Sequence, residues 1–137
     1  MLFTEDEISR QLTALNERQK ELWCLYTINT ILKDSRLSLD EMMNQIILEI
    51  PNGYQFPENC QAVILLNGKE YKPDHLIASG TPQMARIRQN GKETGEIRVY
   101  CHLNTNPPAL QHFLLEEQKL IDTIAESISQ TITLQHY

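Results

Sequence analysis

Three arginines are the side chains best suited to binding a small anion. Arg86, Arg88 and Arg98 lie in two segments predicted to form one β-hairpin, and a guanidinium group pairs well with a carboxylate or a phosphate. The preferred register of this hairpin puts Arg86, Arg98 and Tyr100 on the same face of the sheet. Glutamates of the same hairpin lie close enough to neutralise the arginines. Cross-strand pairing on a solvated face is therefore the favoured interpretation, and anion binding is the alternative.

Two cysteines and a histidine form a second group with chemical potential. Cys60 opens one predicted strand and Cys101 lies near the end of another, so antiparallel pairing would bring the two thiols near each other. A redox switch is one interpretation, and two small buried apolar residues are the favoured one. The side chain of His102 should point away from that of Cys101, because neighbouring strand residues alternate between faces. We therefore expect no metal site here.

The motifs of common enzyme classes do not occur in the sequence. Gly91-Lys92 lacks the upstream glycine of a phosphate-binding loop, and neither Gly-x-Gly-x-x-Gly nor Gly-x-Ser-x-Gly is present. We therefore expect a module without catalytic residues of its own.

Composition narrows the classes of partner. The chain has 137 residues, of which 18 are acidic and 12 basic, and this net charge of −6 disfavours phosphate backbones and anionic lipid surfaces. Its longest aliphatic run, Ala62 to Leu66, is far shorter than the ~20 residues that span a bilayer. The first residues do not resemble an export signal, and the three cysteines are irregularly spaced. We expect reduced thiols, a cytoplasmic location, no membrane insertion and no nucleic-acid partner.

The N-terminal segment has the pattern of a coiled coil. A helix is predicted from Thr4 to about Lys33, with a hydroxyl cap and acidic residues in its first turn. Positions spaced alternately by four and three residues carry Ile8, Leu12, Leu15, Gln19, Leu22, Tyr26 and Asn29. This spacing favours self-association, and a helix folded back on its own domain is the alternative. Residues 1–20 are predicted to be a projecting coiled-coil extension and residues 21–134 the globular domain.

Two further helices are predicted. The second is amphipathic, begins at a cap formed by Ser38 or Asp40, and stops at Pro51. The last runs from about Phe113 to Leu134, after a connector at residues 104–109.

Between these helices the apolar residues recur every 2 residues instead of every 3.6, which indicates strands. The segment from Cys60 to Leu66 is apolar on both faces, as expected of a central strand. Asn67-Gly68 then turns the chain into a short charged strand in which Tyr71 lies opposite Ile64. This strand ends at Pro73 and is predicted to form an edge of the sheet.

The second hairpin is predicted to comprise Gln83 to Gln89 and Thr94 to Leu103. A three-residue loop, Asn90-Gly91-Lys92, places Ala85 opposite Ile97, whereas a two-residue loop would place Ala85 opposite Glu96. We prefer the three-residue loop because it keeps the apolar residues of both strands on one face.

This order of elements predicts an α+β fold. Strands without intervening helices form an antiparallel sheet, and only the first and fourth strands have the character of interior strands. The predicted strand order is therefore 2-1-4-3. Long N- and C-terminal helices are expected to cover one face of the sheet.

One stretch resembles a known family. The run Ile50-Pro51-Asn52-Gly53-Tyr54-Gln55-Phe56-Pro57-Glu58 resembles the Ile-Pro-x-Gly-Trp-Gln-Tyr-Pro-Glu stretch of GAF-like sensor domains of bacterial sensor histidine kinases and related signalling proteins. The likeness extends over about residues 20–132. Later segments that agree in the same order are Cys60-Gln61-Ala62, Asn67-Gly68-Lys69-Glu70-Tyr71, Gly91-x-x-x-Gly95-Glu96-Ile97, Val99-Tyr100 and Phe113-Leu114-x-Glu116-Glu117.

The resemblance implies a GAF/PAS-like fold in a cytoplasmic module that reports a signal through a dimeric helical bundle. It implies no catalysis, and it implies a place in a two-component system such as that of a histidine kinase. No histidine of the chain is followed by the glutamate typical of a phosphoacceptor site. We therefore expect the chain to be either one module excised from a longer protein or a stand-alone sensor.

Tyr54, Phe56 and Glu58 are the ligand candidates within the resembling stretch. Tyr54 stands where Trp is usual, and Phe56 stands where Tyr is usual, so that one hydroxyl of the relatives is absent. These side chains could form a lid or pocket wall over the open face of the sheet. A loop pinned by aromatic packing is the favoured alternative.

The resulting hypothesis is a non-catalytic sensory or regulatory module. A small-molecule or redox signal would pass through a homodimer interface built from the terminal helices, and the sequence does not indicate which ligand or cofactor is read. A purely structural dimerisation domain without a ligand is the alternative. The predicted interface residues are Leu12, Leu15, Leu22, Tyr26, Ile121, Ile124 and Ile128.

Overall fold

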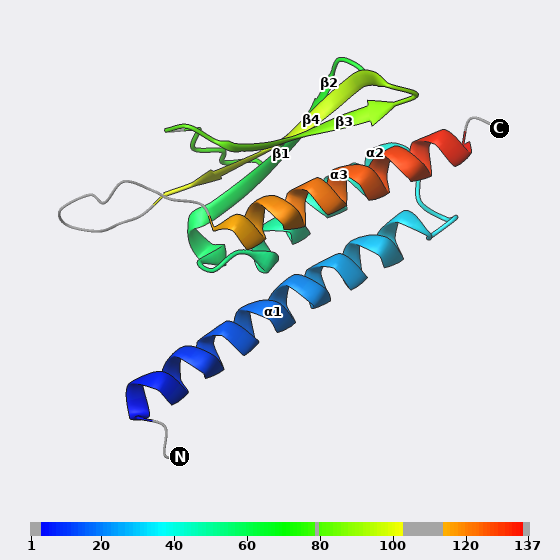
Figure 1. The fold of residues 1–137 in the computed structure, drawn as a ribbon. Helices are drawn as coiled ribbons and strands as arrows, with labels where there is room; N and C mark the ends of the chain where they lie inside the picture. The colour runs from blue at the N-terminus through cyan, green and yellow to red at the C-terminus, as the bar shows by residue number, and fades with distance from the viewer. Residues whose placement is uncertain (1–3, 79, 103–113, 136–137) are drawn as a thin grey trace.

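A computed structural model of the chain describes residues 4–78, 80–102 and 114–135. Its elements follow one another as α1 (Glu5–Leu32), α2 (Leu39–Glu49), the 3-10 helices η1 (Ile50–Gly53) and η2 (Pro57–Asn59), β1 (Cys60–Leu66), β2 (Lys69–Tyr71), β3 (Gln83–Gln89), β4 (Lys92–Cys101) and α3 (Leu115–Gln135), as drawn in Figure 1. The predicted helix start at Phe113, the predicted strand end at Leu103 and the connector at residues 104–109 lie outside the described residues.

Both N-terminal helices begin at the predicted caps. The side chain of Thr4 accepts a hydrogen bond from the backbone of Glu7, and the Glu7 carboxylate accepts one from the backbone of Thr4. Ser38 and Glu41 form the same reciprocal pair at the start of α2. Each pair satisfies backbone donors that the first helical turn leaves open, which fixes where these helices begin.

The sheet is antiparallel with strand order β2-β1-β4-β3, as predicted. Ile64 pairs with Tyr71 across the first hairpin, which confirms the predicted register. Val63 is buried although it lies on the face of β1 away from the helices. This burial on both faces agrees with the central position of β1.

The predicted loop of the second hairpin is wrong, although its register is right. Ala85 pairs with Ile97 as expected, but Gln89 pairs with Lys92, which leaves a two-residue turn at Asn90-Gly91. Both turn residues have positive φ, as a turn of this kind requires. A β-bulge at Thr94 supplies the extra residue that restores the register of the remaining pairs.

Helices cover one face of the sheet in two layers. α3 packs along β3 and α2 packs on β1, while α1 lies farther out, against α2, η1 and α3 (Figure 1). Both terminal helices therefore lie on this side, α3 directly on the sheet and α1 over it. The core between the sheet and the helices includes Met43, Ile46, Ile64, Ile87, Ile97, Val99, Ile121, Ile124 and Ile128.

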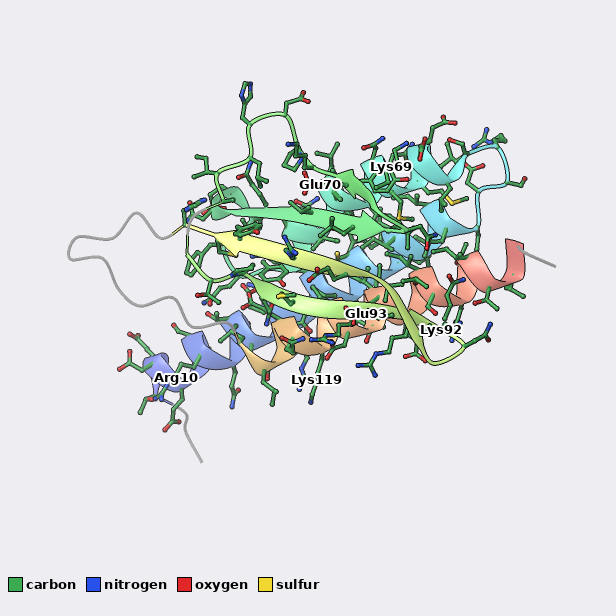
Figure 2. The ribbon with its side chains drawn as sticks, turned by 90° about the horizontal axis from the view of Figure 1, so that it is seen from above. Arg10, Lys69, Glu70, Lys92, Glu93 and Lys119 are labelled. Carbon is green, nitrogen blue, oxygen red and sulfur yellow. A yellow bond between two sulfur atoms is a disulfide. The ribbon has the colours of Figure 1, made fainter. Side chains whose placement is uncertain are left out.

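The other face of the sheet carries no helix of the described chain. Figure 2 looks down on this outer face, with the helices behind it and Glu70 of β2 and Glu93 of β4 near its two margins. Polar side chains alternate here with the buried residues of β3 and β4. The sheet thus presents a polar outer face to which the predicted ligand candidates of the second hairpin belong.

Candidate functional site

Two of the three arginines, Arg86 and Arg98, are paired with carboxylates. Arg98 lies 2.9 Å from Glu96, and Arg86 lies 3.1 Å from Glu93 across the hairpin turn. The hydrogen bond that Arg98 donates to Glu96 is the main influence that raises the pKa of Arg98. This pairing supports the interpretation of a solvated face more strongly than that of an anion site.

Hydrogen bonds hold the loop that contains His75 and Ile77 against one end of the outer face. The amide side chain of Gln61 donates to the backbone oxygen of His75 at 2.8 Å and accepts from the backbone of Ile77 at 2.8 Å. The ring nitrogen Nε2 of His102 also lies 2.6 Å from the Ile77 oxygen. β1 and the end of β4 thereby position the segment that follows β2. The described residues contain no cluster of three metal-ligating side chains.

Tyr54 lies on the opposite side of the sheet from Arg98. Its ring is buried in the core, and its hydroxyl donates to Oε1 of Gln83 at 2.5 Å. Burial, followed by the nearby charge of Glu117, raises the pKa of Tyr54. Phe56 and Glu58 are exposed. The packing interpretation therefore holds for Tyr54, and the structure does not bring the six predicted ligand residues together. Those residues are Tyr54, Phe56, Glu58, Arg86, Arg98 and Tyr100.

The expectation of three reduced thiols is wrong, because Cys60 and Cys101 form a disulfide. These residues lie directly opposite each other in the antiparallel pairing of β1 with β4, which brings their side chains into bonding range. Cys24 is free and buried. Burial, aided by the carboxylate of Glu49, raises the pKa of Cys24 to about 12, which leaves this thiol protonated and unreactive.

The predicted interface residues divide into two groups. On α1, Leu12, Leu15, Leu22 and Tyr26 are all exposed, as a contact surface requires. On α3, Ile121, Ile124 and Ile128 are fully buried within the protomer, so their assignment to a dimer interface is wrong. The same helical spacing of apolar residues is found on a face buried in the core and on a face that binds a partner. The packing of α3 on β3 shows that the apolar face of α3 is of the first kind.

Acidic side chains of α1 and α3 lie near one another and form a cluster that the sequence did not suggest. Glu117 is buried near the start of α3, where it accepts from the backbone of Leu114 at 2.8 Å and from that of Gln55 at 3.1 Å. Burial and the charges of Glu116, Glu117 and Glu17 raise the pKa of Glu21 on α1. Glu117 thus connects α3 to the segment between η1 and η2. The adjacent pair Glu116-Glu117 was the only sequence signal for this contact.

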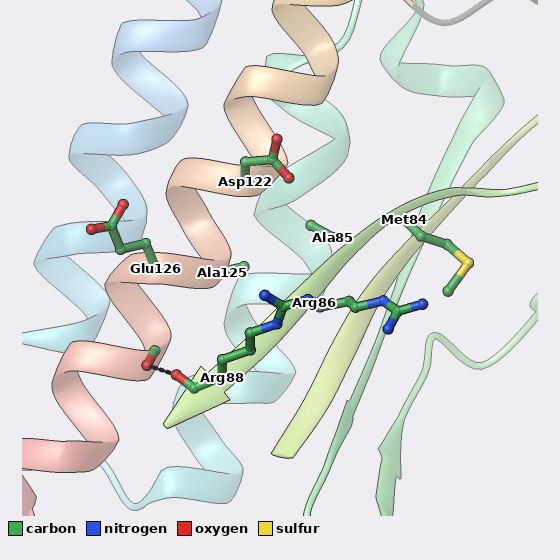
Figure 3. Close-up of a pocket in the computed structure, with 8 residues that line it drawn as sticks. Met84, Ala85, Arg86, Arg88, Asp122, Ala125 and Glu126 are labelled. Carbon is green, nitrogen blue, oxygen red and sulfur yellow. Dashed lines mark hydrogen bonds between the residues drawn. The ribbon is translucent and has the colours of Figure 1, made fainter. Parts of the chain in front are cut away.

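A surface groove of about 450 Å³ lies between β3 and α3. Figure 3 shows Arg88 of β3 across from Asp122 and Glu126 of α3. The backbone oxygen of Met84 accepts from Gln118 at 2.9 Å, and that of Arg88 accepts from the hydroxyl of Ser129. Side chains of α3 therefore occupy part of the hydrogen-bonding edge that β3 would otherwise offer to another strand.

Comparisons with protein-family models, with curated proteins and with solved structures find no match to this chain. The fold itself defines an α+β protein with a four-stranded antiparallel sheet, and its most distinctive exposed feature is the apolar stripe of α1. Within the described residues, no helix is both long enough and apolar enough to cross a membrane.

Proposed function

We propose that this chain is a non-catalytic regulatory module of a signal-transduction protein, acting as a cytoplasmic homodimer. The observation that carries the proposal is the exposed stripe formed by Ile8, Leu12, Leu15, Leu22 and Tyr26, whose exposed fractions lie between 44 and 67%. Five large apolar side chains along one face of a helix are costly to leave in water. A second copy of the same helix would cover them.

The two faces of α1 support a role in passing a signal from the body of the protomer to the dimer interface. Cys24, Ile28 and Leu32 pack into the body of the protomer, while the exposed stripe lies on the opposite face. One continuous helix therefore contacts both the sensor body and the proposed partner. A change in the body that favours one packing of α1 would also favour one arrangement of the two helices in the dimer. The free energy of such coupling is typically ~1–3 kcal/mol.

The Cys60–Cys101 disulfide supports redox as one form of the signal. It joins the starting residue of β1 to the final residue of β4. The segment before β1 also contacts α3, because the backbone of Gln55 donates to Glu117. A reductant of the dithiol class would convert the disulfide to two thiols while becoming oxidised itself, and would remove the covalent link between the strands.

The resemblance to GAF-like domains favours a small molecule as the other form of signal, and it favours a histidine kinase system as the context. The outer face of the sheet, near Arg98 and Tyr100, is the surface that such a ligand would use.

A purely structural dimerisation domain is the second candidate. It is favoured by one observation: the predicted ligand residues lie on both sides of the sheet, with Tyr54 in the core and Arg98 on the outer face. This candidate shares the helical dimer but responds to no ligand. A thermal-shift screen of nucleotides, organic acids and haem separates the two candidates, because a bound ligand raises the melting temperature. Stabilisation by none of them, together with an unchanged dimer after reduction, would favour the structural candidate.

The dimer itself is tested by Leu22→Asp, which places a charge in the middle of the stripe. We expect the dissociation constant to rise at least ~100-fold, since two carboxylates would be buried without partners. Thr13→Asp on the same helix, outside the stripe, is the matched control and should remain dimeric. Sedimentation velocity measures the state of association and circular dichroism confirms the fold. Equal sedimentation of Leu22→Asp and the unmodified chain would refute the proposed interface.

A further inference from the structure

We propose that α1 pairs with α1 of a second copy in a parallel, in-register coiled coil. This inference rests on the proposed function and specifies how the two copies of that dimer are oriented. Heptad positions on α1 follow from the alternating spacing of the stripe. Position a carries Leu12, Gln19 and Tyr26, and position d carries Ile8, Leu15, Leu22 and Asn29.

Gln19 is the residue that distinguishes the two orientations. It is exposed on the protomer and lies between Leu15 and Leu22, as the one polar residue among the a and d positions from Ile8 to Tyr26. In a parallel, in-register pair, position a meets position a, so the two Gln19 amides can donate to and accept from each other. In an antiparallel pair, position a meets position d, so each Gln19 would be buried against Leu15 or Leu22 without a polar partner.

The flanking positions support the same orientation. In a parallel pair, a g residue lies beside the e residue five positions later in the partner, which places Arg18 beside the partner's Trp23. Trp23 is 69% exposed, and its ring stacks on Tyr26 with 5.6 Å between centroids. A guanidinium over this aromatic face gains a cation–π attraction. In the antiparallel register that sets Gln19 beside the partner's Leu15, the two Arg18 charges would instead lie next to each other.

No like charges oppose each other along the rest of the parallel pair. The other e and g positions between residues 9 and 30 carry neutral side chains, namely Ser9, Gln11, Asn16, Leu25 and Thr30. The charged residues of this stretch lie mainly on the faces turned away from the stripe, as with Arg10 (Figure 2) and Lys20, which forms an ion pair with Glu17. Selection of the orientation therefore rests on Gln19 and on the contact between Arg18 and Trp23.

The body of each protomer leaves this arrangement accessible. Leu22 borders a shallow groove between α1 and α3, so α3 flanks the stripe on one side. Leu22 is nevertheless 67% exposed, and Cys24 and Ile28 are the residues of α1 that pack inward, half a helical turn from Tyr26. Two protomers related by a two-fold axis along α1 would hold their sheets outside the coil and at the same end. A signal reaching both bodies would then act on the same end of both helices.

Cysteine cross-linking of the full chain tests the orientation. In a parallel, in-register pair, the two thiols of Leu12→Cys face each other, and mild oxidation by a copper complex joins them while the oxidant accepts the two electrons. In an antiparallel pair, Leu12 would lie beside residue 22 or 29 of the partner, about 15–25 Å along the axis from the partner's Leu12. We expect most of the Leu12→Cys protein to become a covalent dimer. The matched controls are Thr13→Cys, which lies outside the stripe, and the unmodified chain. We expect both to give little covalent dimer.

The outcomes separate this inference from the proposed function. A dimer by sedimentation in which Leu12→Cys cross-links no better than Thr13→Cys would overturn the parallel orientation and leave the proposed dimer standing. A monomer by sedimentation would overturn both. In a second variant, Gln19→Leu added to Leu12→Cys, we expect the dimer to persist and the yield of Leu12 cross-link to fall at least twofold, because the layer that specifies orientation is gone. An unchanged yield would contradict the role assigned to Gln19.

Discussion

The hydroxyl of Tyr54 donates a hydrogen bond of 2.5 Å to Oε1 of Gln83 inside the core. Tyr54 follows η1, and Gln83 opens β3, so this bond connects two segments far apart in the sequence. A tyrosine hydroxyl is protonated at neutral pH and can donate there, and burial raises the pKa of Tyr54 further. The tyrosine that stands in place of the usual tryptophan of the resembling family therefore has a polar partner of its own.

Tyr54→Phe should destabilise the protein by about 1–3 kcal/mol, because it leaves the Gln83 oxygen buried without this donor. Chemical denaturation monitored by circular dichroism measures the change. Phe56→Leu is the matched control on the same segment. Phe56 is largely exposed, so this change should stay within about 0.5 kcal/mol. Equal effects of the two substitutions would contradict the structural role of Tyr54.

Sequence periodicity was sufficient to predict the order and register of the strands, because both depend on which side chains are apolar. The pairs Ile64–Tyr71 and Ala85–Ile97 follow directly from keeping apolar residues on one face. The bulge at Thr94 could not be predicted in this way, since a bulge and a longer loop shift the register equally. The two-layer packing of helices was also not predicted, because α1 and α3 both carry apolar stripes.

The candidate site was predicted less well than the fold. Ile121, Ile124 and Ile128 have the spacing of an interface but are buried in the core of the protomer. Tyr54 was expected near the arginines, yet the sheet lies between them. The sequence indicates which side chains could bind a ligand, but it does not show on which side of the sheet each of them lies in the folded chain.

The Cys60–Cys101 bond should stabilise the protein by restricting the unfolded chain. The two cysteines are 41 residues apart, and closing a loop of this length contributes about 4 kcal/mol in the chain-entropy description. Cys101→Ala should therefore lower the melting temperature, whereas adding a dithiol reductant should have no further effect on that variant. Mass spectrometry after alkylation counts the free thiols of the native chain. Alkylation of Cys60 and Cys101 without a reductant would contradict the assignment.

Gly95 permits a close approach of β4 to β1. A Cβ atom at this position would lie only 2.0 Å from the backbone oxygen of Leu65, and backbone cannot move aside as the end of a side chain can. We expect Gly95→Ala to cost about 1–3 kcal/mol or more. Gly68→Ala is the comparison, since that site is open and only its positive φ of 82° opposes the change, at about 1 kcal/mol. Denaturation curves in which Gly68→Ala costs more than Gly95→Ala would contradict this account.

The charge of Glu21 should cost stability at neutral pH. Burial and the neighbouring acids raise the pKa of Glu21 in the folded protein above its ordinary value of 4.5. A raised folded-state pKa means that the favourable contribution is complete below the unfolded pKa and is lost as pH rises through the folded pKa.

Glu21→Gln should therefore raise the melting temperature at about pH 7 and make little difference at about pH 3, where the carboxyl group of the unmodified chain is protonated. Glu126→Gln, on the exposed side of α3, is the control. Thermal unfolding at both pH values measures the effect. A gain of the same size at both values would show that the charge of Glu21 is not its cause.

The central claim is that the exposed stripe of α1 holds two copies together, and the mass in solution tests it most directly. Sedimentation equilibrium of the intact chain over a range of concentrations should give about twice the protomer mass of 15.9 kDa, falling toward the protomer mass on dilution. A mass of one protomer at every concentration would contradict the account.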